Sequence, residues 1–152
     1  IQTGGSINPG NDGAGKLNNV GNFNLQAGAS LGINLDGTGA GSGYDQLDVT
    51  GGVTLAGMLV VNVGFIPTNG NLFFIVNNDG NDAVSGTFSN ASINGEKYTF
   101  GGRQFEISYF GDTFTNSFTG GNDVVLMAVP EPASALLGGL GILLILRRRR
   151  AA

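Results

Sequence analysis

The sequence predicts an all-β fold in which β-solenoid or β-helix-like rungs are closed by antiparallel strands, with a β-sandwich as the alternative and one C-terminal transmembrane helix. Two stretches, residues 23–35 and 47–65, carry apolar or small side chains at every second position, which is the period of a strand. Glycine supplies 28 of the 152 residues and only 12% are charged, a composition that disfavours a helical bundle. Residues 133–146 are uncharged and mostly apolar, and four arginines follow them.

The alternation assigns a direction to the side chains of the first two stretches. The odd-numbered apolar side chains are expected to face the interior, and they include Leu25, Ile33, Val53, Leu55 and Val61. The polar side chains between them are expected to face outward or line corners, and they include Asn24, Asn34, Thr54 and Asn62. Residue types that suit a pleated, half-exposed surface thus occupy the outward positions.

The two stretches also resemble each other. Residues 23–25 overlay residues 53–55 at an offset of 30, and residues 31–35 overlay residues 59–63 at an offset of 28. Self-similarity near this period, built from short strands and glycine corners, is typical of a β-solenoid. Residues 1–66 are therefore predicted to form a solenoid-like repeat region.

Residues 67–128 are predicted to form an antiparallel β cap. Apolar runs at residues 71–76 and 124–129 indicate strands, and the pair Gly101-Gly102 between residues 97–100 and 105–109 indicates a hairpin. We expect these strands to close the open end of the solenoid, because an exposed last rung would be an edge for aggregation.

The composition excludes several classes of function. The chain has no histidine and no cysteine, which removes catalysis by Ser-His-Asp or Cys-His and zinc sites built on those residues. Residues 1–146 hold three basic residues (Lys16, Lys97 and Arg103) against eleven acidic ones, a net charge of −8. Such a body is not suited to bind nucleic acid. No catalytic residue and no cofactor site is predicted.

One segment is similar to a metal-binding motif. Residues 41–47 resemble a single calcium-binding nonapeptide of the β-roll type, with Asp45 as a weak candidate ligand. Such sites need tandem copies, and the next nine residues do not repeat the pattern. A plain turn is the preferred interpretation, and no metal site is predicted.

The C-terminal segment is interpreted as membrane-inserted. As a helix, residues 133–146 would reach about 21 Å, short of the ~30 Å hydrocarbon core. On length alone, a buried core helix or an h-region is the alternative. Four arginines on the C-terminal side can extend the reach by snorkelling to the headgroups. The predicted parts are a transmembrane helix over residues 134–146 and an arginine-rich cytoplasmic tail over residues 147–152, with residues 1–128 outside. The start at Ile1, without an initiator Met or an export signal, leads us to expect a fragment of a longer precursor.

Residues 129–150 are similar to a known sorting signal. The order of parts resembles the PEP-CTERM signal of bacterial surface and exopolysaccharide-associated proteins, with a motif at residues 129–133, an apolar segment and a basic run. The motif residues are Val129, Pro130, Glu131, Pro132 and Ala133, and the basic run is Arg147, Arg148, Arg149 and Arg150. More loosely, residues 44–51 and 121–126 are similar to the last module of autotransporter-like β-strand-repeat passengers.

The resemblance implies how the protein is handled. A PEP-CTERM precursor is exported, held in the inner membrane lipid, and cleaved near the motif by an exosortase that supplies its own nucleophile. The chain is thus expected to be a non-enzymatic protein of the cell surface or extracellular matrix, in contact with exopolysaccharide.

Two alternatives share the same tail. The first is an adhesin or carbohydrate-binding module, which exposed aromatic rows would favour; the candidates are Phe105, Tyr109, Phe110, Phe114 and Phe118. The second is the tail of a β-helical polysaccharide-degrading enzyme.

Overall fold

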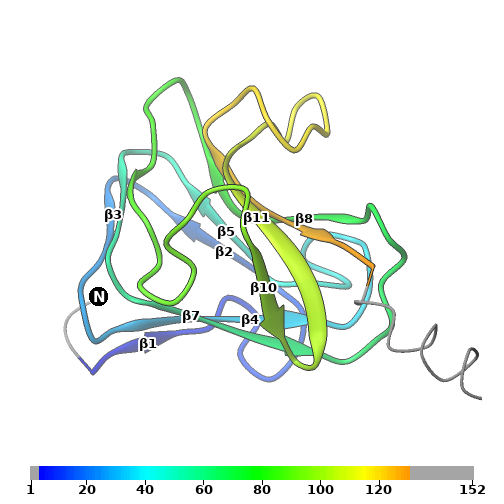
Figure 1. The fold of residues 1–152 in the computed structure, drawn as a ribbon. Coiled ribbons are helices and arrows are strands. Elements are labelled where there is room, and N and C mark those ends of the chain that lie inside the picture. The colour runs from blue at the N-terminus through cyan, green and yellow to red at the C-terminus, as the bar shows by residue number, and fades with distance from the viewer. Residues whose placement is uncertain (1–3, 131–152) are drawn as a thin grey trace, which may run out of the picture.

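Residues 4–130, which a computed structural model describes, form twelve β-strands and no helix (Figure 1). The short strand lengths follow from the glycines and asparagines that interrupt the apolar alternation. In chain order the strands are β1 (Ser6–Ile7), β2 (Lys16–Asn19), β3 (Phe23–Leu25), β4 (Ser30–Leu35), β5 (Gln46–Val49), β6 (Val53–Leu55), β7 (Met58–Val63), β8 (Leu72–Asn78), β9 (Ser85–Gly86), β10 (Lys97–Phe100), β11 (Arg103–Gly111) and β12 (Asp123–Ala128).

Within residues 4–130 the strands make three sheets. Two have three parallel strands each, in the orders β1-β4-β7 and β3-β6-β9. The third has six strands in the order β10-β11-β12-β8-β5-β2, of which β2, β5 and β8 are parallel and the others antiparallel. In Figure 1 the β1-β4-β7 sheet runs along the bottom, β3 stands at the left, and β2, β5 and β8 cross the back.

The residues that match each other in the two similar stretches lie opposite each other in paired strands. Phe23 lies opposite Val53 and Leu25 opposite Leu55, at an offset of 30. Leu31 lies opposite Leu59 at an offset of 28. The alignment predicted from the sequence is therefore confirmed at these two strand pairs.

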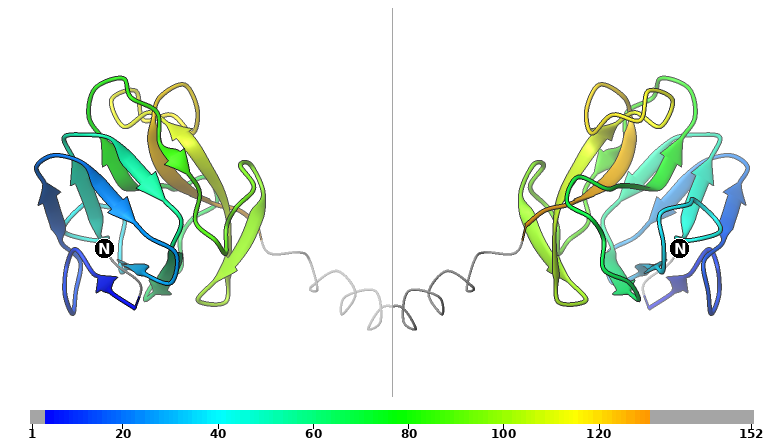
Figure 2. Two further views of the ribbon diagram at one scale, coloured as in Figure 1. Left: turned by 90° about the vertical axis from the view of Figure 1, so that its left-hand side faces the viewer. Right: turned by 90° about the vertical axis from the view of Figure 1, so that its right-hand side faces the viewer.

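The structure is all-β as predicted, but the predicted solenoid closed by antiparallel strands is wrong. In the described part of the chain none of the sheets is closed and no solenoid is formed; the fold is all-β, with open parallel and mixed sheets. The antiparallel strands do not close an end. Instead β12 pairs antiparallel with the edge of β8 that β5 leaves open, so β10, β11 and β12 widen the six-stranded sheet sideways (Figure 2). The alternative, a β-sandwich of antiparallel sheets, is wrong as well, because most of the strand pairs are parallel.

The core lies where the inward side chains of the three sheets meet. All five residues that the alternation placed inside are at most 6% exposed. Of the outward ones, Asn24, Thr54 and Asn62 are exposed and Asn34 is half-buried. Asn34 and Asn62 do stack, with the Asn62 amide donating to Asn34 Oδ1 at 3.1 Å. They lie within the paired strands β4 and β7 and not at corners.

The predicted hairpin is confirmed, and the rest of residues 67–128 is more mixed than expected. β10 and β11 pair antiparallel around Gly101 and Gly102. Both glycines have positive φ, 53° and 76°, which a two-residue hairpin turn of this hand requires. β8 and β9, by contrast, pair parallel to β5 and β6. The boundary between residues 66 and 67 stays a prediction.

No helix in residues 4–130 is long and apolar enough to cross a membrane. The predicted transmembrane helix, residues 134–146, and the predicted tail, residues 147–152, lie outside the described residues.

Candidate functional site

The sorting motif begins where the last strand leaves the sheet. Ala128, at the end of β12, donates its N–H to the carbonyl of Asn71 at 2.9 Å and accepts the N–H of Gly70 at 2.8 Å. Val129 donates one further hydrogen bond, to the carbonyl of Gln104 at 3.1 Å. Pro130 has no N–H to donate, and it is exposed.

A hollow of about 260 Å³ lies beside this exit point. Its lining comes from the β7–β8 connection, from the start of β11 and from the end of β12, and it includes Ile66, Pro67, Arg103, Val129 and Pro130. Ile66 is 75% exposed although it is a large apolar residue. The first two motif residues thus form part of a shaped surface of the body.

The remaining sorting residues lie outside the described part of the chain. These are Glu131, Pro132 and Ala133 of the motif, and Arg147, Arg148, Arg149 and Arg150 of the basic run. Their roles stay predictions from the sequence.

Asp45, the weak calcium candidate, holds two stretches of backbone together. It is fully buried. Its Oδ1 accepts the N–H of Gly15 and its Oδ2 accepts the N–H of Asn34, both at 2.8 Å. Hydrogen bonds to backbone N–H groups satisfy a buried carboxylate without a metal ion. Among residues 4–130 no three Asp, Glu, His or Cys side chains gather as a metal site.

Asp123 has the same role and was not singled out from the sequence. It is 4% exposed, and its Oδ1 accepts the N–H of Asn78 at 2.8 Å. Its Oδ2 accepts the N–H of Thr113 at 2.7 Å and the hydroxyl of the same residue at 2.5 Å. Asp45 directly precedes β5 and Asp123 begins β12. An aspartate at the start of an apolar strand is therefore the sequence signal that would have pointed to Asp123.

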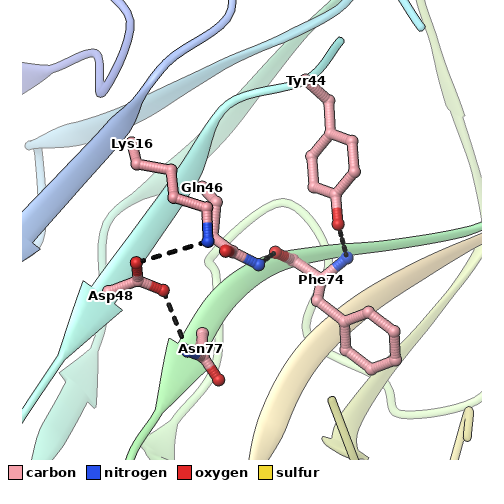
Figure 3. A network of polar contacts seen from close by, with 6 residues as sticks. All are labelled: Lys16, Tyr44, Gln46, Asp48, Phe74 and Asn77. Carbon is pink, nitrogen blue, oxygen red and sulfur yellow. Dashed lines mark hydrogen bonds and ion pairs between the residues drawn. The ribbon is translucent and has the colours of Figure 1, made fainter. Parts of the chain in front are cut away.

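A network of polar side chains joins the parallel strands of the six-stranded sheet (Figure 3). The buried Gln46 amide donates to the carbonyl of Phe74 at 2.8 Å, and the N–H of Phe74 donates to the Tyr44 hydroxyl at 3.3 Å. Asp48 accepts the Asn77 amide at 2.9 Å and pairs with the Lys16 ammonium at 3.7 Å. These contacts join β2, β5 and β8, and each of the polar groups is used by the fold.

The five aromatic candidates separate into two groups. Phe105 and Tyr109 belong to the core, at 0% and 4% exposure. Phe110 and Phe114 are exposed, at 52% and 99%, and Phe118 is half-buried. The second group lies at the end of β11 and in the loop that follows it, and β12 separates that loop from the sorting motif.

Comparisons with protein-family models, with curated proteins and with solved structures find no match for this chain.

Proposed function

We propose that the chain is a non-enzymatic, exported protein of the bacterial surface or extracellular matrix, and that residues 129–150 are a sorting signal cleaved by an exosortase. The single observation that carries the proposal is the order of three parts: a Pro-Glu-Pro motif, an uncharged apolar segment and four arginines. Before cleavage, the apolar segment and the arginines hold the precursor at the inner membrane lipid. The catalytic nucleophile belongs to the exosortase.

The body supports this proposal at the point where it ends. A processing enzyme needs a segment that is not locked into a sheet, and proline at position 130 cannot extend the ladder beyond Val129. Pro130 is exposed, so the motif starts in contact with solvent. The prolines also bias the residues before them toward extended conformations, the form in which proteolytic enzymes bind their substrates.

The proposal predicts that the motif is needed for processing and not for folding. Replacing Pro130, Glu131 and Pro132 by alanine should leave the body folded and the precursor uncleaved at the membrane. The chain offers a control in which Pro9 and Glu96, neither of which lines the hollow beside the motif, are replaced by alanine. The control should be processed at the wild-type rate, as followed by mass on a denaturing gel of membrane and extracellular fractions.

Processing of the triple motif variant at the wild-type rate, in a host that has the exosortase, would refute the sorting role of residues 130–132.

A further inference from the structure

The loop of residues 112–122, which joins β11 to β12, holds a phenylalanine almost entirely in water. Phe114 is 99% exposed, and Phe110, two residues before the loop, is 52% exposed. An exposed aromatic ring gains nothing from burial in the core. The Phe114 ring therefore adds little to the stability of the fold, and it is accessible to a ligand.

The loop is ordered by its own hydrogen bonds. Asp112 Oδ1 accepts the N–H of Phe114 at 2.9 Å and that of Thr115 at 3.1 Å, and its Oδ2 accepts the Thr115 hydroxyl at 2.6 Å. Asp112 and Ser117 exchange both backbone hydrogen bonds, each at 2.9 Å. These bonds, the one from the Thr115 hydroxyl first, hold the pKa of Asp112 below its usual value.

The base of the loop is fixed to the core. Asp123, buried at the start of β12, accepts two hydrogen bonds from Thr113. Gly121 donates its N–H to the carbonyl of Phe110 at 3.0 Å. The Phe114 ring is therefore carried on a pre-formed loop, which reduces the entropy lost when a ligand binds.

A polar side chain lies two residues beyond the ring. Asn116 is exposed, and its amide makes no hydrogen bond with any described residue. Its backbone is left-handed, with φ of 52°. An exposed aromatic ring and an exposed amide in the same loop suit a sugar, which presents C–H groups on the face of its ring and hydroxyls at its edge.

The charge of the region selects among ligands. Between residues 104 and 130 the sequence has no lysine or arginine, whereas Glu106, Asp112 and Asp123 are acidic. A stretch of chain without cationic side chains does not favour phosphate, sulfate, uronate or anionic lipid. A neutral ligand is favoured.

The position of the loop fits contact with material away from the anchor. The loop precedes Asp123 and the sorting motif follows Ala128, so the two lie at opposite ends of β12 (Figure 1). Six residues of strand separate them by about 20 Å. If the C-terminus is held at a membrane, which rests on the proposed function, the loop faces away from it.

We propose that the 112–122 loop binds a neutral polysaccharide, with Phe114 stacked on a sugar ring and Asn116 hydrogen-bonded to its hydroxyls. Binding requires the ring, the amide and the ordered loop together.

The test is affinity electrophoresis of the full chain in native gels with a polyoxyethylene detergent, which has no sugar headgroup. The gel contains either hydroxyethyl cellulose, a neutral β-1,4-glucan, or alginate, a polyuronate. Hydroxyethyl cellulose should retard the wild-type chain and alginate should not. Phe114→Ala should weaken the apparent affinity at least about fivefold.

Two further variants separate the proposed contacts from changes in the fold. Asn116→Gly keeps the left-handed backbone and removes the amide, and it should also weaken binding. Val20→Ala, at a site that is 90% exposed elsewhere on the surface, should bind as the wild type does. None of these substitutions changes the net charge, so mobilities without polysaccharide should coincide.

Any of three results would overturn the proposal: no retardation by hydroxyethyl cellulose, equal retardation of the wild type and Phe114→Ala, or retardation by alginate alone. A wild-type dimer that Phe114→Ala makes monomeric, with no effect of the glucan, would assign the ring to a second copy instead. Sorting is measured by cleavage at the C-terminus, so failure of this proposal and failure of the proposed function are distinguishable.

Discussion

At the scale of single residues, the fold depends on a few buried polar side chains that bond to backbone. Asp45 and Asp123 each join two segments that are distant in sequence. Tyr109 does the same with a hydroxyl: it accepts the N–H of Phe88 at 3.0 Å and donates to the carbonyl of Ala91 at 2.7 Å. Removing such a partner, and so leaving a buried backbone group without a hydrogen bond, lowers the free energy of unfolding by roughly 1–3 kcal/mol.

Tyr109 makes the stability of the fold depend on pH in the alkaline range. Burial raises its pKa from 10.0 to about 12, with the Phe88 N–H opposing the shift. Between pH 10 and 12 the folded state keeps the phenol proton while the unfolded state loses it. The contribution of Tyr109 to the free energy of unfolding is therefore complete below pH 10 and is lost as the pH rises toward 12. The loss is about 2–3 kcal/mol.

Urea unfolding followed by circular dichroism between pH 8 and 12 should therefore show a falling stability. Tyr109→Phe should be less stable by about 1–3 kcal/mol at pH 8 and should show a smaller further loss above pH 10. Tyr98→Phe is the matched control, because its hydroxyl accepts the N–H of Ile93 in an exposed setting, and it should keep the wild-type slope. An unchanged alkaline slope in Tyr109→Phe would refute this role.

At the scale of the strands, the period-two pattern predicted which side chains point inward because that depends only on local geometry. It did not predict which strand edges meet. The edge of β7 shows why: Asn90 Oδ1 accepts the N–H of Leu59 at 2.9 Å, and its amide donates to the carbonyl of the same residue at 2.8 Å. One side chain thus replaces a neighbouring strand, which covers an exposed edge, and no local pattern marks it.

The register of β6 predicts opposite effects at adjacent positions. Leu55 is 2% exposed and Thr54 is exposed on the other face. Leu55→Ala should lower the free energy of unfolding by about 2–5 kcal/mol, whereas Thr54→Ala should change it by less than about 1 kcal/mol. Both are measured by urea unfolding at neutral pH. Equal losses would mean that β6 is placed in the wrong register.

At the scale of the whole molecule, the all-β composition and the repeat offsets were predictable, and the architecture was not. Parallel pairing at offsets of 30 and 28 follows from similar strands in succession. The addition of β12 to β8 depends on edges that come together only in the folded chain. For the candidate sites, the sequence identified the sorting motif and the aromatic residues, but it grouped the buried Phe105 and Tyr109 with the exposed Phe110 and Phe114.

The central proposal is that the C-terminus is a sorting signal, and the intact mass of the mature protein tests it most directly. The protein is purified from its own host and from the same host without the exosortase, and the C-terminal peptide is sequenced by mass spectrometry. The account predicts a mature chain that ends near residues 130–132 and lacks Arg147, Arg148, Arg149 and Arg150, with the full C-terminus kept in the strain without the exosortase. A mature chain from the host that has the exosortase, and that still contains Arg147, Arg148, Arg149 and Arg150, would contradict it.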